Sequence, residues 1–172
     1  MKKIVLLGYM GAGKSFFGKE LANITQRKFI DLDEHIEKSE NTSIEILFKT
    51  KGELYFRKKE HQYLIEILNC DEEIVLSLGG GTPCYFNNMD LFQKEDVISV
   101  YIKASVETLF QRLKAQKSQR PLIAGIEDND LKEFIAKHLF DRSYFYNQAN
   151  IKINVDEKEV NEVVNELVAL IR

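Results

Sequence analysis

Cysteine and proline are scarce in this chain, which has only two residues of each. Cys70 and Cys84 lie far apart without metal-ligand spacing, so we expect reduced thiols rather than a disulfide. No run of about 18 apolar residues is available to cross a membrane, and a strand pattern begins at Lys3, which leaves no room for a signal peptide. The net charge of −3 provides no basic surface for nucleic acid or an acidic membrane. These absences favour a cytoplasmic protein with neither nucleic acid nor membrane as partner.

Internal repeats, linkers and low-complexity tracts are also absent from the sequence. The 172 residues are enough to bury one hydrophobic core, and 44% hydrophobic and 30% charged residues are ordinary values for a soluble protein. We therefore expect a single domain over residues 1–172. Because nothing in the sequence demands a partner subunit, we expect a monomer.

Apolar runs and helical patterns alternate along the chain. Strands are expected at 3–7, 28–31, 74–78, 97–102 and 151–155. Helices are expected after the first strand, over 42–48 and 53–69, from Ser105, and over 130–147 and 160–171. This alternation predicts an α/β fold in which helices cover both faces of a parallel sheet. Ligands of such sheets bind at the carboxyl ends of the strands.

Some local details of the helices can also be predicted. Thr42 and Glu45 fit a capping box that opens the 42–48 helix, and Ser105 fits an N-cap. The apolar face of the 53–69 helix is assigned to Leu54, Leu64, Ile65 and Leu68. Three isolated histidines lack metal-ligand spacing and are interpreted as surface or packing residues, namely His35, His61 and His138.

The most informative segment is Gly8–Ser15, with the sequence GYMGAGKS, which matches the phosphate-loop pattern G-x-x-x-x-G-K-[ST]. It lies between an expected strand and an expected helix, as the motif requires. Its glycines let successive amide N–H groups face one concavity at the start of a helix, where an anion is stabilised. Lys14 supplies an ammonium for the β- and γ-phosphates, and Ser15 a hydroxyl for Mg²⁺. The predicted nucleotide site consists of Gly11, Ala12, Gly13, Lys14, Ser15 and Phe16.

Further motifs lie at or after the expected strand ends. They are Asp31-Leu32-Asp33, Phe56-Arg57-Lys58-Lys59-Glu60, Gly79-Gly80-Gly81, Arg120-Pro121-Leu122, and Arg142 with Tyr146. Taken singly, each has an ordinary explanation, such as helix capping, a solvated helix face, a flexible turn or an exposed salt-bridge partner. Their coincidence behind a phosphate loop favours one shared functional site.

Together, these motifs resemble those of the shikimate kinase family over nearly the whole chain. The resemblance implies ATP-dependent phosphorylation of the 3-hydroxyl of shikimate, in aromatic amino acid biosynthesis, with Mg²⁺ as cofactor. It also implies a three-layer P-loop kinase fold with a five-stranded parallel sheet. A lid would lie at about 113–127, and a substrate-binding helical region at about 33–62.

The resemblance further implies roles for individual residues. Arg57 and Arg142 would bind the shikimate carboxylate, because guanidinium forms a rigid bidentate fork. Asp33 would accept hydrogen bonds from the ring hydroxyls, either as a positioning group or as a base. Asp31 would lie near Mg²⁺ and act through a coordinated water. The backbone would approach the ring at Gly79, Gly80 and Gly81, with Gly80 making the direct contact.

Two arginines complete the implied nucleotide site. Arg120 would move onto the phosphates when the lid closes, and Arg112 matches the family position near the adenine. Closure would exclude water from the phosphoryl transfer. The sequence departs from the family pattern at Phe16, where threonine is usual, and at Ser143-Tyr144-Phe145, which replaces a proline-containing stretch. From the first departure we expect a changed nucleotide affinity. The second departure leaves the orientation of Arg142 open.

Two alternative functions stay open on the sequence. A nucleoside monophosphate or gluconate kinase could use the same fold, although Asp33 suits a hydroxyl better than an anionic acceptor. A P-loop switch could bind nucleotide without transferring phosphate. Against the switch, the sequence has no guanine-specifying N-K-x-D motif, and it retains Lys14, Asp33, Arg57 and Arg120.

Overall fold

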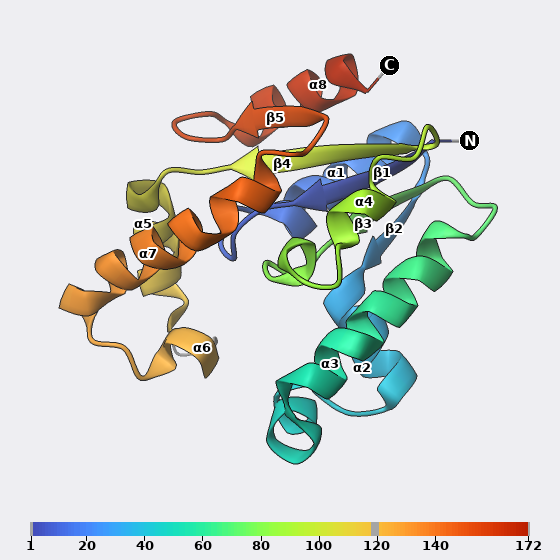
Figure 1. Cartoon of the computed structure of the whole chain (residues 1–172). Helices are drawn as coiled ribbons and strands as arrows, with labels where there is room; N and C mark the ends of the chain where they lie inside the picture. Colours follow the sequence, from blue (N-terminus) through green and yellow to red (C-terminus); the bar gives the residue numbers. More distant parts are fainter. Residues whose placement is uncertain (1, 118–120, 172) are drawn as a thin grey trace.

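The computed structural model describes residues 2–117 and 121–171. Its centre is a five-stranded parallel sheet with the strand order β2-β3-β1-β4-β5 (Figure 1). The strands are β1 (Lys3–Leu7), β2 (Lys28–Asp31), β3 (Ile74–Ser77), β4 (Val97–Lys103) and β5 (Ile151–Asn154). All five lie where the sequence pattern predicts a strand, and the predicted α/β fold is confirmed.

Helices surround this sheet on both faces. They are α1 (Lys14–Thr25), α2 (Leu32–Glu40), α3 (Ile44–Leu68), α4 (Asn88–Leu91), α5 (Val106–Ala115), α6 (Pro121–Ala124), α7 (Asp128–Tyr146) and α8 (Val160–Leu170), with a 3₁₀ turn η1 (Thr82–Cys84). Every residue of β1 and β3 is buried. Because successive side chains of a strand point to opposite faces, this burial requires cover on both sides. In the ranges that the structure describes, no helix is long and apolar enough to span a membrane.

The region between β2 and β3 contains two long helical segments. α2 has no counterpart among the helices expected from periodicity, and it begins directly after β2. α3 is interrupted at Gly52, whose φ of 81° and ψ of 168° are not helical, so the helical pieces match the predicted 42–48 and 53–69 segments. The Thr42 capping box is wrong: the N-cap of α3 is Ser43, whose hydroxyl accepts a hydrogen bond from the Ile46 amide. The Ser105 N-cap of α5 is confirmed.

The buried face of α3 differs in part from the predicted one. Leu64 and Leu68 are buried as expected, but the Leu54 side chain is 64% exposed. Phe56 and Glu60 are buried instead, at the i, i+4 spacing that continues to Leu64. A residue two positions before Phe56 lies about 200° around the helix, so Leu54 faces away from the core. The buried carboxylate of Glu60 hides this face from an analysis of apolar periodicity.

The two leucines of α3 provide a matched test of this packing. We expect Leu64→Ala to lower the free energy of unfolding by about 2–5 kcal/mol, because it leaves a cavity in the core. Leu54→Ala should change the free energy by about 0.5 kcal/mol or less, since its side chain is exposed. Urea denaturation followed by circular dichroism measures both. Equal losses in the two variants would contradict the described orientation of α3.

Candidate active site

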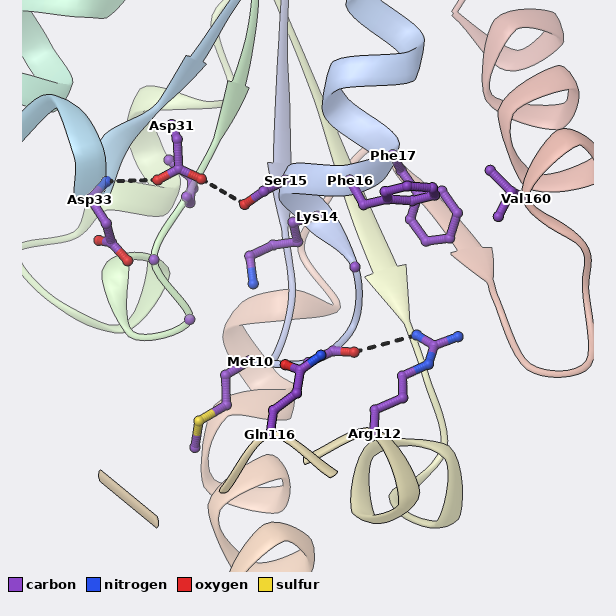
Figure 2. Close-up of a pocket in the computed structure, with 15 residues that line it drawn as sticks. Met10, Lys14, Ser15, Phe16, Phe17, Asp31, Asp33, Arg112, Gln116 and Val160 are labelled. Carbon is purple, nitrogen blue, oxygen red and sulfur yellow. Dashed lines mark hydrogen bonds between the residues drawn. The ribbon is translucent and has the colours of Figure 1, made fainter. Parts of the chain in front are cut away.

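Three neighbouring strands bring the predicted site residues to one edge of the sheet. In the parallel register, Asp31 at the end of β2 pairs with Ser77 at the end of β3, and Ser77 pairs with Leu6 of β1. The phosphate loop follows β1, and the glycine segment follows β3. A cavity of about 520 Å³ lies at this edge, and its lining includes Lys14, Asp33 and Gly80 (Figure 2).

Within the phosphate loop, Gly13 is the N-cap of α1 and has a φ of 100°, in the left-handed region that favours glycine. The first turn of α1 therefore directs backbone N–H groups toward the cavity, where an anion is stabilised. The Lys14 ammonium is buried and donates to the carbonyls of Gly8 and Tyr9 at 2.9 and 3.1 Å. The positive charge thus lies against the loop that is predicted to bind phosphate.

Ser15 and Asp31 meet beside this loop, as the predicted metal site requires. The Ser15 hydroxyl donates to Asp31 Oδ2 at 2.6 Å and lies 3.2 Å from the Ser77 hydroxyl. The other Asp31 oxygen, Oδ1, accepts hydrogen bonds from the Asp33 and Glu34 amides and so caps α2. Figure 2 shows Asp31 between Ser15 and the start of α2. The sequence left helix capping and a functional role as alternatives for the Asp31-Leu32-Asp33 motif. The Asp31 side chain can serve both, because each of its oxygens has a different partner.

Hydroxyl and carboxylate oxygens are the ligands that Mg²⁺ prefers, so Ser15 and Asp31 fit this ion chemically. Within the described part of the chain, no group of three or more His, Cys, Asp or Glu side chains could hold a metal ion. A site with so few protein ligands suits a cation that keeps most of its waters.

The segment Gly79-Gly80-Gly81 makes room for three charged side chains. A β-carbon built on each glycine would lie 2.9 Å from Asp33 Oδ1 at Gly79, 3.3 Å from Arg142 Nη1 at Gly80, and 2.6 Å from Arg57 Nη2 at Gly81. At 2.6 Å, a β-carbon would overlap the Arg57 guanidinium. The glycines therefore allow a carboxylate and two guanidinium groups to gather along one stretch of backbone.

Arg57 is held rigidly on α3. Its Nη1 donates to the buried carboxylate of Glu60 at 2.8 Å, and its guanidinium lies over the Tyr85 ring at 4.2 Å. Glu60 also accepts a hydrogen bond from the Thr82 hydroxyl at 2.6 Å. Glu60 was not predicted as a functional residue, although its i, i+3 spacing from Arg57 signals the ion pair. The interpretation of Arg57 as part of a solvated helix face is wrong, because its side chain is only 11% exposed.

Asp33 lies in an unfavourable place for a negative charge. Burial, and then the neighbouring carboxylates of Asp31 and Glu60, raise the pKa of Asp33 to about 6, against the opposing effect of Lys14 and Arg57. A carboxylate with such a pKa is ionised at neutral pH and is a better proton acceptor than an ordinary aspartate. Asp33 can therefore either accept a hydroxyl proton or orient the hydroxyl.

Helix α7 contributes Arg142 and Tyr146 from adjacent turns. The Tyr146 hydroxyl donates to the Gly80 carbonyl at 2.5 Å, and Arg142 Nη1 lies beside the same glycine. Arg142 Nη2 lies 3.0 Å from His138 Nε2, a contact that sequence reasoning missed. The unusual Ser143-Tyr144-Phe145 stretch does not break the helix, which continues to Tyr146.

Arg112 and Phe16, two further predicted residues, also line the cavity. Arg112 Nη1 donates to the carbonyls of Gly11 and Ala12 at 3.3 and 3.1 Å. Phe16 is 53% exposed and lines the cavity together with Val160 (Figure 2). Arg120 lies outside the described residues, and so does part of the predicted lid.

Comparisons with known proteins identify the family of this chain. A sequence model of the shikimate kinase family matches residues 10–172. The chain belongs to this family. A shikimate kinase from Flavobacterium johnsoniae is 52% identical over 171 residues, which cover 99% of both proteins. A crystal structure of shikimate kinase from Bacteroides thetaiotaomicron has a TM-score of 0.91 at 37% identity, over 99% of this chain and 98% of that one.

A second solved structure bears on the acceptor. Shikimate kinase from Acinetobacter baumannii, in complex with shikimate, has a TM-score of 0.88 at 30% identity, over 99% of this chain and 93% of that one. Membership of the shikimate kinase family, predicted from the motifs, is therefore confirmed, and with it the expectation of an ATP-dependent kinase.

The environment of Asp33 gives a direct prediction. The carboxyl carbon of Asp33 should titrate with a midpoint near pH 6 in the ligand-free protein, as measured by carbon NMR. Asp31→Asn keeps an oxygen to cap α2 but removes the neighbouring negative charge, so the pKa of Asp33 should fall. A midpoint near 4 in the parent protein would contradict the described burial of this carboxyl.

Proposed function

We propose that this protein transfers the terminal phosphoryl group of ATP to the 3-hydroxyl of shikimate, giving shikimate 3-phosphate and ADP. The reaction belongs to the route to chorismate and the aromatic amino acids. The observation that carries the proposal is the gathering of Asp33, Arg57 and Arg142 along Gly79–Gly81, a segment whose first two glycines line the same cavity as Lys14 and Asp33. These are the groups that a small ring with one carboxylate and several hydroxyls needs.

On the acceptor side, Arg57 and Arg142 would pair with the shikimate carboxylate. Guanidinium forks suit this task because they donate two parallel hydrogen bonds to a planar anion. Asp33 would accept a hydrogen bond from the ring hydroxyls and so aim the 3-hydroxyl at the nucleotide. The close approach of backbone at Gly80 would let the ring lie against the segment without a clash.

On the nucleotide side, the loop amides and Lys14 would hold the β- and γ-phosphates. Phosphoryl transfer depends chiefly on positioning and on stabilising charge, and these groups supply both. Ser15 and Asp31 would hold Mg²⁺, Asp31 through a coordinated water, and the ion would neutralise phosphate charge. Arg112 and Phe16 would line the nucleotide end of the cavity. Arg120, in a lid at about 113–127, would add a positive charge in the transition state.

We further propose that residues 1–172 act as one domain, with the substrate-binding helical region at about 33–62, and that the protein is a cytoplasmic monomer. The absence of a membrane-crossing helix from the described ranges is compatible with this setting. A negative net charge of −3 argues against a nucleic acid partner.

An assay of ADP release tests the proposed reaction. With ATP and Mg²⁺, shikimate should stimulate ADP release far above the rate without an acceptor, while gluconate, AMP and CMP should not. For AMP and CMP, the physical reason is that Asp33 accepts hydrogen bonds from hydroxyls but repels a phosphate. Gluconate has a carboxylate and hydroxyls but no ring, so it tests whether the site requires the rigid ring. Faster turnover with a competing acceptor, or ADP release that ignores shikimate, would overturn the proposal.

Arg57 and its neighbour Lys58 form a matched pair on α3. Arg57→Ala should weaken shikimate binding by about 2–5 kcal/mol, because the acceptor carboxylate loses a desolvated partner. Lys58→Ala should leave the shikimate KM unchanged, since Lys58 is exposed. Steady-state kinetics with saturating ATP measure both variants. An unaltered shikimate KM in Arg57→Ala would refute the role of Arg57.

A further inference from the structure

His138 lies between the phosphate loop and the acceptor-side arginine. This half-buried histidine of α7 places Nδ1 3.1 Å from the Tyr9 hydroxyl and Nε2 3.0 Å from Arg142 Nη2. The Tyr9 and His138 rings meet edge to face, with centroids 5.8 Å apart. The Arg142 guanidinium in turn lies over the Tyr9 ring, 5.6 Å from its centroid. The three side chains form one contiguous cluster, which reaches Gly80 through Arg142.

The donors in this cluster determine the protonation of the imidazole. A guanidinium can only donate hydrogen bonds, so His138 Nε2 must accept from Arg142 and carry no proton. A neutral imidazole then carries its proton on Nδ1, which donates to the Tyr9 oxygen. Both ring nitrogens are thereby engaged, one by the phosphate loop and one by Arg142.

We propose that neutral His138 is a positioning residue that fixes the Arg142 guanidinium beside Gly80 for the acceptor carboxylate. This inference rests on the proposed function, because it takes Arg142 as a carboxylate-binding group. Arg142 Nη2 is bonded to His138, while Nη1 lies 3.3 Å from the β-carbon position of Gly80, a residue that lines the cavity. Fixing one end of the fork in advance lowers the conformational entropy lost when the carboxylate binds.

Protonation of His138 would reverse this effect. An imidazolium has no acceptor for Arg142, and it would place a second positive charge beside the guanidinium. Within residues 2–117 and 121–171, the groups facing His138 are Tyr9 of the phosphate loop and, on α7, Arg142, Asp141 and the uncharged ring of Phe134. Burial and the charge of Arg142 lower the pKa of His138, and Asp141 opposes them, so the neutral form prevails at neutral pH.

Two substitutions of His138 separate hydrogen bonding from packing. His138→Gln keeps an acceptor near the Nε2 position, and His138→Leu fills similar space without one. We expect His138→Leu to raise the shikimate KM about tenfold, with kcat and the ATP KM within about twofold of the parent, because a charge-assisted hydrogen bond is lost. His138→Gln should stay within about threefold. The matched controls Lys137→Gln and Lys137→Leu alter an exposed neighbour on α7 and should leave the KM unchanged.

A double-mutant cycle with Arg142→Ala tests whether His138 acts through Arg142. If it does, His138→Leu combined with Arg142→Ala should have the shikimate KM of Arg142→Ala alone, because the group that His138 holds is gone. A further increase of about tenfold in the double variant would mean independent effects and would overturn the inference. A change below about threefold in His138→Leu alone would overturn it as well.

The pH dependence of the shikimate KM supplies a readout that a purely structural role would not change. Asp33, with its pKa of about 6, is present in every variant, so a comparison between variants isolates the effect of residue 138. The parent should lose more affinity than His138→Gln as the pH falls through the pKa of His138, which proton NMR of the imidazole locates, since only the parent gains a charge at residue 138. Identical profiles on both sides of that pKa would mean that a charged His138 holds Arg142 as well as a neutral one, and would overturn the inference. Absence of shikimate turnover in the parent would contradict the proposed function itself, whereas normal turnover with unchanged His138→Leu kinetics contradicts only the role of His138.

Discussion

The site depends on the absence of side chains at Gly79–Gly81. Three charged side chains approach this segment from three different elements: Asp33 from α2, Arg57 from α3 and Arg142 from α7. Side chains on this segment would push these groups apart, because the β-carbon positions already lie at or inside contact distance. The parallel register of β2, β3 and β1 then sets this segment beside the phosphate loop. Acceptor groups and phosphate groups thus share one edge of one sheet.

Charge in this small space is balanced at a cost to stability. The pKa of Asp33 is raised above its unfolded value, so ionising Asp33 opposes folding at neutral pH, and this cost fades as the pH falls through about 6. Glu60 adds a second buried negative charge, and Arg57 pairs with it at 2.8 Å. An anionic acceptor carboxylate between Arg57 and Arg142 would use positive charge that the protein has already gathered. Functional sites commonly hold such mutually opposed charges.

Much of this site can be predicted from the sequence, because its motifs follow buried strands whose ends are easy to recognise. The strand before Gly79 and the strand before Gly8 both stand out as short apolar runs followed by glycines. Long-range partners could not be predicted in the same way. His138 has no local pattern that reveals its contact with Tyr9, 129 positions away, and Ser77 is an ordinary serine until the register places it beside Ser15. Leu54 was misassigned because a buried glutamate, Glu60, occupies the face where apolar periodicity is sought.

The divided bonding of Asp31 limits how the sequence can vary at that position. One carboxylate oxygen holds the first turn of α2, and the other holds the Ser15 hydroxyl. Asparagine would preserve the turn but discard the charge, whereas glutamate would carry its oxygens one methylene too far to cap the same amides. Asparagine would therefore alter the charge beside Ser15 alone, whereas glutamate would also disturb the first turn of α2. Phe16 differs from Asp31 because it lines the cavity but is largely exposed. A substitution at Phe16 can therefore change nucleotide binding at a smaller cost to the stability of the fold.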